Sequence, residues 1–160
     1  MSPVRNNALV SFTNYSADLC IDQTDGNPAD GTPVIGHRYN GYKHQQWRLQ
    51  NVGTTGPWPI YIIKNEETGS YLDLTNGKAD NGTKITTWHG GDTINPNQHW
   101  RFITGDPANP NTVMIQNVRT GTFVDLFEGR KLEQTPIVGW NGDFKNLGNI
   151  YHQQWKVQDV

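Results

Sequence analysis

Three aspartates lie between apolar residues at a regular interval and could accept hydrogen bonds from a ligand. They are separated by 51 and 52 residues, and the runs that hold them read CID, YLDL and FVDL. A carboxylate in such surroundings needs hydrogen-bond partners, and its two oxygens can accept two roughly parallel O–H donors. The pattern favours a binding role for Asp22, Asp73 and Asp125. The alternative is a structural role, in which each carboxylate only holds a turn or a glutamine.

Two tryptophans could supply flat binding surfaces. Trp88 and Trp140 are followed by glycine and polar residues, in WHGGD and WNGD, and do not stand in apolar runs. A large exposed ring is costly unless it binds something, and a ring face offers rigid, amphipathic contact. The alternative is that each ring only covers the rim of the protein core.

A Gln-x-Trp motif occurs three times, as HQQW (44–47), NQHW (97–100) and HQQW (152–155). Its tryptophans, Trp47, Trp100 and Trp155, are 53 and 55 residues apart. We expect them to fill a shared core, because each ring brings a large apolar surface. The glutamine two positions earlier is expected to point to the same face of a strand and to hydrogen-bond nearby polar groups.

The elements that position these residues are short strands in three repeats. Each repeat opens with a β-rich run, namely ALVSFT, IYIIK or TVMIQ, and 17 glycines and 9 prolines supply frequent turns. About four strands are expected in each repeat. Such small units cannot bury a core alone, so they should pack around a pseudo-threefold axis into one closed all-β domain. The predicted domain spans 1–160, with repeats at about 8–52, 59–104 and 111–158.

Charge and composition exclude several function classes. The formal net charge of −2 and the lack of a basic stripe argue against nucleic acid as a partner. The sequence contains no run of 18 apolar residues, so no membrane span is predicted. The single cysteine, Cys20, cannot form an internal disulfide, and the opening MSPVRNNALVSF does not read as a secretory signal. A reducing, cytoplasmic setting is therefore expected.

The three repeats resemble those of the ricin B-type lectins, which adopt the β-trefoil fold. The resemblance rests on the repeated Asp, the turn followed by an apolar strand, and Gln-x-Trp, and it covers about residues 8–158. Without disulfides, the chain looks most like the intracellular lectins of fungi. The resemblance implies a sugar site in each repeat. There the Asp accepts two sugar hydroxyls, an aromatic residue stacks on the pyranose, an Asn binds another hydroxyl and the glutamine braces the Asp.

Carried over residue by residue, the second repeat matches this pattern fully. Its predicted site residues are Asp73, Trp88, Asn97 and Gln98. The third repeat keeps Asp125, Trp140 and Gln153 but has His152 in place of the Asn. The first repeat keeps Asp22 and Gln45, with His37 at the stacking position and His44 at the Asn position. The expected order of sites is second, third and first.

The resemblance favours terminal galactose or N-acetylgalactosamine, and leaves mannose and N-acetylglucosamine open. A second class of function is a trefoil that binds a protein partner, as an accessory subunit of an enzyme or a protease inhibitor. The segment TTGPWPI (54–60), with Trp58 between two prolines, is the loop candidate for such a partner. Self-association into a homodimer also stays open.

No enzyme activity, cofactor or metal is expected. Glycoside hydrolysis needs two carboxyl groups roughly 5–10 Å apart, whereas the repeated aspartates belong to separate repeats. Three of the five histidines, His37, His44 and His152, occupy positions of the repeat pattern and are not gathered in one unit. Zinc usually needs three or four converging ligands, so no metal cluster is expected. Cys20 stands where the other repeats have apolar residues, so it is expected to be a small buried side chain.

Overall fold

The structure, a computed structural model, describes residues 2–91, 94–104, 108–109, 111–142 and 150–160. Within these ranges the chain forms twelve β-strands and short 3-10 turns, without an α-helix. The first four strands are β1 (Leu9–Asn14), β2 (Cys20–Gln23), β3 (Thr32–His37) and β4 (Trp47–Thr55). The next four are β5 (Trp58–Asn65), β6 (Tyr71–Leu74), β7 (Thr83–Trp88) and β8 (Trp100–Thr104). The last four are β9 (Thr112–Asn117), β10 (Phe123–Leu126), β11 (Thr135–Trp140) and β12 (Trp155–Asp159).

Six of the strands close into a barrel. Antiparallel pairs run β1–β12, β12–β9, β9–β8, β8–β5, β5–β4 and β4–β1, which returns to the starting strand. Each group of four strands therefore gives its first and last strand to the barrel. Closure leaves no free edge around the ring. The predicted all-β class and β-trefoil fold are confirmed.

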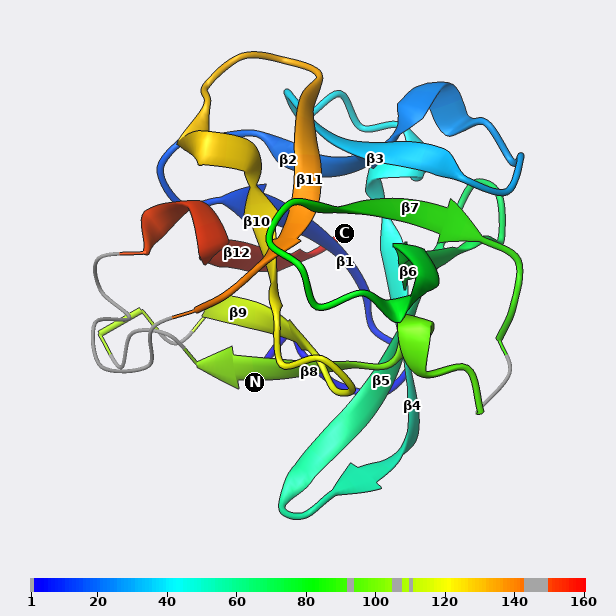
Figure 1. The fold of residues 1–160 in the computed structure, drawn as a ribbon. Helices are drawn as coiled ribbons and strands as arrows, with labels where there is room; N and C mark the ends of the chain where they lie inside the picture. Colours follow the sequence, from blue (N-terminus) through cyan, green and yellow to red (C-terminus); the bar gives the residue numbers. More distant parts are fainter. Residues whose placement is uncertain (1, 92–93, 105–107, 110, 143–149) are drawn as a thin grey trace.

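The other six strands form three hairpins that cap one end of the barrel (Figure 1). These hairpins are β2–β3, β6–β7 and β10–β11. Their second strands also pair with each other, β3 with β7, β7 with β11 and β11 with β3. The resulting triangle is the pseudo-threefold arrangement that the repeats predict.

The barrel and its cap enclose one hydrophobic core. Trp47, Trp100 and Trp155 are each at most 1% exposed and pack among aliphatic side chains from all three groups of strands. Burial of these three large rings removes apolar surface from water and so stabilises the fold. Cys20 is also fully buried, with its Sγ 3.4 Å from Thr13 Oγ1, and burial raises the pKa of its thiol.

The β4–β5 hairpin extends beyond the barrel, at the bottom of Figure 1. It pairs as far as Thr55 with Trp58, and a bulge lies between Asn51 and Gly53. The segment 54–60 is therefore the end of a hairpin, and the expectation of a loop there is wrong. Trp58 is 48% exposed, and the Arg101 guanidinium lies 5.3 Å from the centre of its ring.

Candidate functional site

The cap hairpins explain why an aspartate and a distant aromatic residue can meet. In the second hairpin Asp73 on β6 pairs with Thr86 on β7, and Tyr71 pairs with Trp88. Directly opposed residues share a face of the sheet, and residues two apart on one strand also share a face. Asp73 and Trp88 therefore point to the same side of the hairpin. Asp125 and Trp140 have the same relation in the third hairpin.

The second hairpin forms one wall of a pocket of about 320 Å³. Asp73, Trp88 and Asn97 all line it, so the structure brings together three of the four residues predicted for this site. Asp73 is 5% exposed and Trp88 is 43% exposed. A buried acceptor beside an open ring face is an arrangement that suits a small polar ligand with one flat apolar side. The other lining residues are Gly31, Thr75, Asn76, Lys84, Thr86 and Asn95.

The motif glutamine braces the aspartate in every repeat. Its Nε2 donates to the Asp Oδ2 over 2.8 Å for Gln45–Asp22, 3.0 Å for Gln98–Asp73 and 2.8 Å for Gln153–Asp125. The same Nε2 donates to a backbone carbonyl after the third strand, at Arg38, His89 and Asn141. Each glutamine ends a 3-10 turn before the last strand, namely η2 (Lys43–Gln45), η4 (Pro96–Gln98) or η7 (Tyr151–Gln153). The expectation that it lies on a strand is wrong, because this turn is needed to aim the amide at the carboxylate.

The motif tryptophan holds the backbone beside the same aspartate. The indole N–H groups of the three tryptophans donate, each over 3.0 Å, to the carbonyls of Ile21, Leu72 and Val124. These carbonyls belong to the residues immediately before Asp22, Asp73 and Asp125. Gln-x-Trp therefore fixes the aspartate twice, once at its side chain and once at its backbone.

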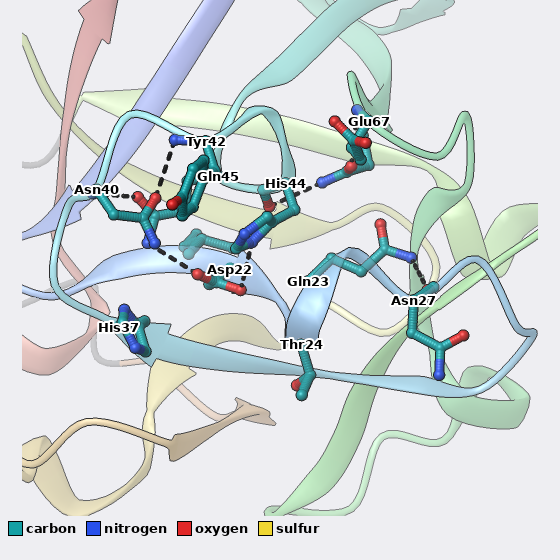
Figure 2. Close-up of polar contacts among 12 residues, drawn as sticks. Asp22, Gln23, Thr24, Asn27, His37, Asn40, Tyr42, His44, Gln45 and Glu67 are labelled. Carbon is teal, nitrogen blue, oxygen red and sulfur yellow. Dashed lines mark hydrogen bonds and ion pairs between the residues drawn. The ribbon is translucent and has the colours of Figure 1, made fainter.

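The first repeat closes its carboxylate with a histidine. Figure 2 shows Asp22 held between Gln45 and His44, whose Nδ1 lies 3.0 Å from Asp22 Oδ1. His37, at the stacking position, contacts the Arg38 carbonyl (3.0 Å) and Glu133 (3.5 Å). The first site thus has both carboxylate oxygens occupied and its small platform engaged by neighbours.

The third repeat repeats this closure, and the second does not. His152 Nδ1 lies 2.8 Å from Asp125 Oδ1, which leaves Asp125 1% exposed. Among the described residues, only Gln98 donates a hydrogen bond to the Asp73 carboxylate. Asn97, at the position of these histidines, lies in the pocket wall without bonding Asp73. The second repeat is therefore the one whose acceptor faces the pocket with a free oxygen.

Burial makes the aspartates unusual acids. It raises the pKa of Asp22 and of Asp73, and in each case the glutamine hydrogen bond offsets part of the effect. The nearby Asp30 carboxylate raises the pKa of Asp73 further. An ionised Asp73 is thus less favourable in the folded chain than in the unfolded chain. A site residue held at a cost to stability is typical of a functional position.

The pairing of His152 with Asp125 should make stability depend on pH. The hydrogen bond to Asp125 raises the pKa of His152 above its usual 6.5, against the effect of burial. A histidine with a raised folded-state pKa stabilises the fold fully below its unfolded pKa, and this stabilisation is lost as pH rises through the folded value. We expect the wild type to have a higher urea midpoint than His152→Gln. The difference should be largest below pH 6.5 and smallest above the raised pKa of His152. A difference that grows with rising pH would contradict this assignment.

Each stacking residue is also supported by the repeat before it. The backbone N–H of His89, next to Trp88, donates to Asp30 Oδ1 (2.8 Å), and His89 Nδ1 lies 2.6 Å from Asp30 Oδ2. In the third site the backbone N–H of Asn141 donates to Asn81 Oδ1 over 2.8 Å. In the first site Glu133 from the third repeat contacts His37. These supports could not be predicted from the sequence, since nothing in a single repeat indicates which neighbour it will contact.

Gly90 is a further residue that the sequence analysis missed. A Cβ at this position would lie 2.2 Å from Gln98 Oε1 and 2.8 Å from its Nε2. Gln98 is fully buried and could move only by giving up its bonds to Asp73 and His89. The glycine pair after Trp88 was the available signal, because it marks a close approach to the backbone.

No metal or membrane element accompanies the site in the described part of the chain. No group of three or more His, Cys, Asp or Glu side chains there is placed to hold a metal ion. No helix in those ranges is long and apolar enough to cross a membrane.

Comparison with known proteins places this architecture among known families. The model of the ricin-type β-trefoil lectin domain-like family matches residues 2–88 and 96–160. A similar solved structure is the Macrolepiota procera ricin B-like lectin in complex with lactose, with 24% identity over 98% of this chain and 99% of that one (TM-score 0.77). The Rhizoctonia solani agglutinin has 20% identity over 98% of this chain and 97% of that one (TM-score 0.78). An exo-β-1,3-galactanase from Clostridium thermocellum has 22% identity over 98% of this chain but 31% of its own (TM-score 0.83).

Proposed function

The chain belongs to the ricin-type β-trefoil lectin domain-like family, and on this premise we propose that it is a lectin whose principal sugar site is the second-repeat pocket. The observation that carries the proposal is the joint placement of Asp73, Trp88 and Asn97 around one pocket, with Gln98 behind the carboxylate. We name this pocket, with the nine lining residues given above, the Asp73 pocket.

The chemistry of the Asp73 pocket suits a pyranose. Asp73 Oδ1 can accept one sugar hydroxyl, and Oδ2, which already accepts from Gln98, has a second lone pair for an adjacent hydroxyl. These charge-assisted bonds are stronger than neutral ones. The exposed face of Trp88 can stack on the C–H face of the ring. Asn97 offers both a donor and an acceptor to a further hydroxyl. We propose terminal galactose or N-acetylgalactosamine as the ligand, and the lactose complex of the Macrolepiota relative supports this choice.

The other two repeats are proposed to bind more weakly. In both, a histidine takes the second carboxylate oxygen, so a sugar hydroxyl would have to displace it or share it. Trp140 still provides a platform in the third repeat, whereas His37 is engaged by Glu133 in the first. The proposed order of affinity is second, third and first.

A glycan array with the purified, labelled protein tests this function. The matched variants are Trp88→Ala and Trp58→Ala, which remove exposed tryptophans inside and outside the Asp73 pocket. We expect signal on galactose-ended glycans to be lost in Trp88→Ala and kept in Trp58→Ala. A blank array from folded wild type would overturn the proposal, and equal signal from both variants would place binding elsewhere.

Replacing Gly90 by alanine should weaken binding without touching the ligand. The added Cβ displaces Gln98, so Asp73 loses its brace. The loss of one positioning hydrogen bond should cost about 1 kcal/mol, or about fivefold in affinity. Titration calorimetry would compare Gly90→Ala, Gln98→Ala and the double variant. Because both act through the same bond, the double variant should be no weaker than Gln98→Ala; additive losses would show that Gly90 acts by another route.

A protein partner is the second candidate function, favoured by the β4–β5 hairpin. This hairpin projects from the barrel (Figure 1). It carries Trp58, which is half-exposed and has the Arg101 guanidinium over its ring. Tryptophan and arginine are enriched where proteins bind each other. A pull-down in which Trp58→Ala loses a partner that Trp88→Ala keeps would support this function.

The single cysteine also favours a reducing compartment, which we propose to be the cytoplasm.

A further inference from the structure

Lys84 gives the Asp73 pocket a positive charge at a strand position where the other two repeats have proline. It lies on β7, lines the pocket and is exposed to solvent. Lys84 is the second residue of its strand, and the residues at the same place in β3 and β11 are Pro33 and Pro136. Among the described residues, Lys84 forms no ion pair. Its ammonium is therefore available to a ligand in the pocket.

Arg119 brings a second positive charge to the same site from the third repeat. A Cβ placed on Gly77 would lie 2.5 Å from Asn97 Oδ1 and 3.6 Å from Arg119 Nη1, so the guanidinium reaches the edge of the pocket beside Asn97. Within the described ranges this guanidinium, too, has no ion-pair partner.

The turn position of Arg119 does not carry a positive charge at the other two sites. Asn65 and Asn117 hold equivalent turns by accepting the N–H of the residue two places on, which is Glu67 in one and Arg119 in the other. Glu67 approaches Gly26 at the first site as Arg119 approaches Gly77 at the second. In the turn of Asn14, which neighbours the third repeat, the equivalent residue is Ser16. Among the described residues, the second site is thus the one that combines a lysine at the strand position of Lys84 with an arginine at the turn position of Arg119.

Neither of the acidic residues described beside the pocket forms an ion pair with Lys84 or Arg119. Asp30 is engaged by His89 through two hydrogen bonds. Asp73 is buried and braced by Gln98, and its remaining oxygen faces the pocket. The pocket therefore combines one acceptor for hydroxyls with two free cations at its wall and rim.

Resting on the proposed function, we propose that the Asp73 pocket selects acidic sugars, which carry a sulfate or a carboxylate beside the hydroxyls that Asp73 accepts. Lys84 is the main specificity-determining residue, and Arg119 strengthens the preference at the rim. A partly exposed charge pair of this kind contributes modestly, so the expected preference over the neutral sugar is about fivefold at low salt.

Titration calorimetry with matched sugars tests this specificity. The probes are the best neutral monosaccharide from the glycan array and its 3-O-sulfate, 6-O-sulfate and uronate forms, which separate sulfate from carboxylate as the source of the charge. The proteins are the wild type, Lys84→Gln, Arg119→Gln and, as a control for net charge, Lys131→Gln in the third repeat. We expect at least one acidic form to bind about fivefold more tightly than the neutral sugar to the wild type and Lys131→Gln. Lys84→Gln should lose this preference, measured within that variant as the ratio of its affinities for the acidic and the neutral sugar.

The ionic strength provides a second readout. Raising NaCl from about 50 mM to about 500 mM should reduce the acidic preference and leave neutral binding unchanged, because salt screens exposed charges. Equal binding of neutral and acidic forms to the wild type, or an undiminished preference in Lys84→Gln, would overturn this inference and leave the lectin function standing. Failure of every sugar to bind would overturn both.

Discussion

Asp73→Asn should abolish sugar binding and leave the fold at least as stable as before. Asn keeps the shape of Asp, but it has one acceptor oxygen and no charge. Gln98 Nε2 already donates to this side chain and to the His89 carbonyl, so the Asn oxygen is drawn to Gln98 and its NH₂ group faces the pocket. Two charge-assisted bonds to sugar hydroxyls are then lost, at about 1.5–3 kcal/mol each, which is about a hundredfold or more in affinity.

The stability of Asp73→Asn follows from the raised pKa of Asp73, which burial causes. Above that pKa the folded chain holds an ionised carboxylate at a cost that the unfolded chain does not have, and Asn removes this cost. Calorimetry with the best array glycan and urea unfolding at pH 7 measure the two effects. Asp125→Asn is the matched control, because His152 and Gln153 occupy the oxygens of Asp125; it should leave binding at the second site unchanged. Binding by Asp73→Asn within about threefold of wild type would show that Asp73 is not the acceptor.

The protonation of Asp73 also sets the pH range of binding. As pH falls through its raised pKa, the carboxylate gains a proton and one oxygen becomes a donor. The affinity of the wild type should therefore decline at a higher pH than an ordinary aspartate would give.

Trp155→Ala should bring the domain close to unfolding. Trp155 is fully buried, and truncation of such a ring leaves a cavity that costs about 3–5 kcal/mol. The Val124 carbonyl also loses its indole donor, which costs about 1–3 kcal/mol if no water replaces it. A domain of ordinary stability has a free energy of unfolding of about 5–15 kcal/mol, so this loss removes a large share of it.

Two variants separate the causes in this second prediction. Trp155→Phe keeps a ring but not the N–H, so its loss should lie between those of wild type and Trp155→Ala. Trp58→Ala removes an exposed tryptophan and should change the free energy of unfolding by less than about 1 kcal/mol. Urea unfolding followed by far-ultraviolet circular dichroism gives all three values. A Trp155→Ala loss as small as that of Trp58→Ala would contradict the role of this ring in the core.

The architecture could be predicted from the sequence because the sequence signals are periodic. The regular spacing of Asp and Gln-x-Trp follows from strands that recur in each repeat, and the buried tryptophans lie where such a pattern predicts. The placement of Trp88 beside Asp73 was also foreseeable, since their distance along the chain matches one hairpin. The boundaries of the repeats stay predictions.

Other features depend on geometry that spacing does not encode. The closure of Asp22 by His44 requires a 3-10 turn that brings an imidazole within 3.0 Å of the carboxylate, and the sequence shows only a replaced Asn. The indole bond to Leu72 and the contact of Asp30 with His89 join residues 28 and 59 positions apart. Such pairs become visible only when the barrel and the cap are assembled.

The support that each repeat gives to the next also limits modularity. Because Asp30 holds the backbone beside Trp88, Asn81 does the same beside Trp140, and Glu133 contacts His37, every site straddles a seam between two repeats. A repeat transplanted alone into another trefoil would carry its acceptor but leave behind the clamp on its platform. A faithful transfer would need to cut the chain inside a repeat, so that each exchanged segment runs from the turn of one unit to the Gln-x-Trp of the following unit.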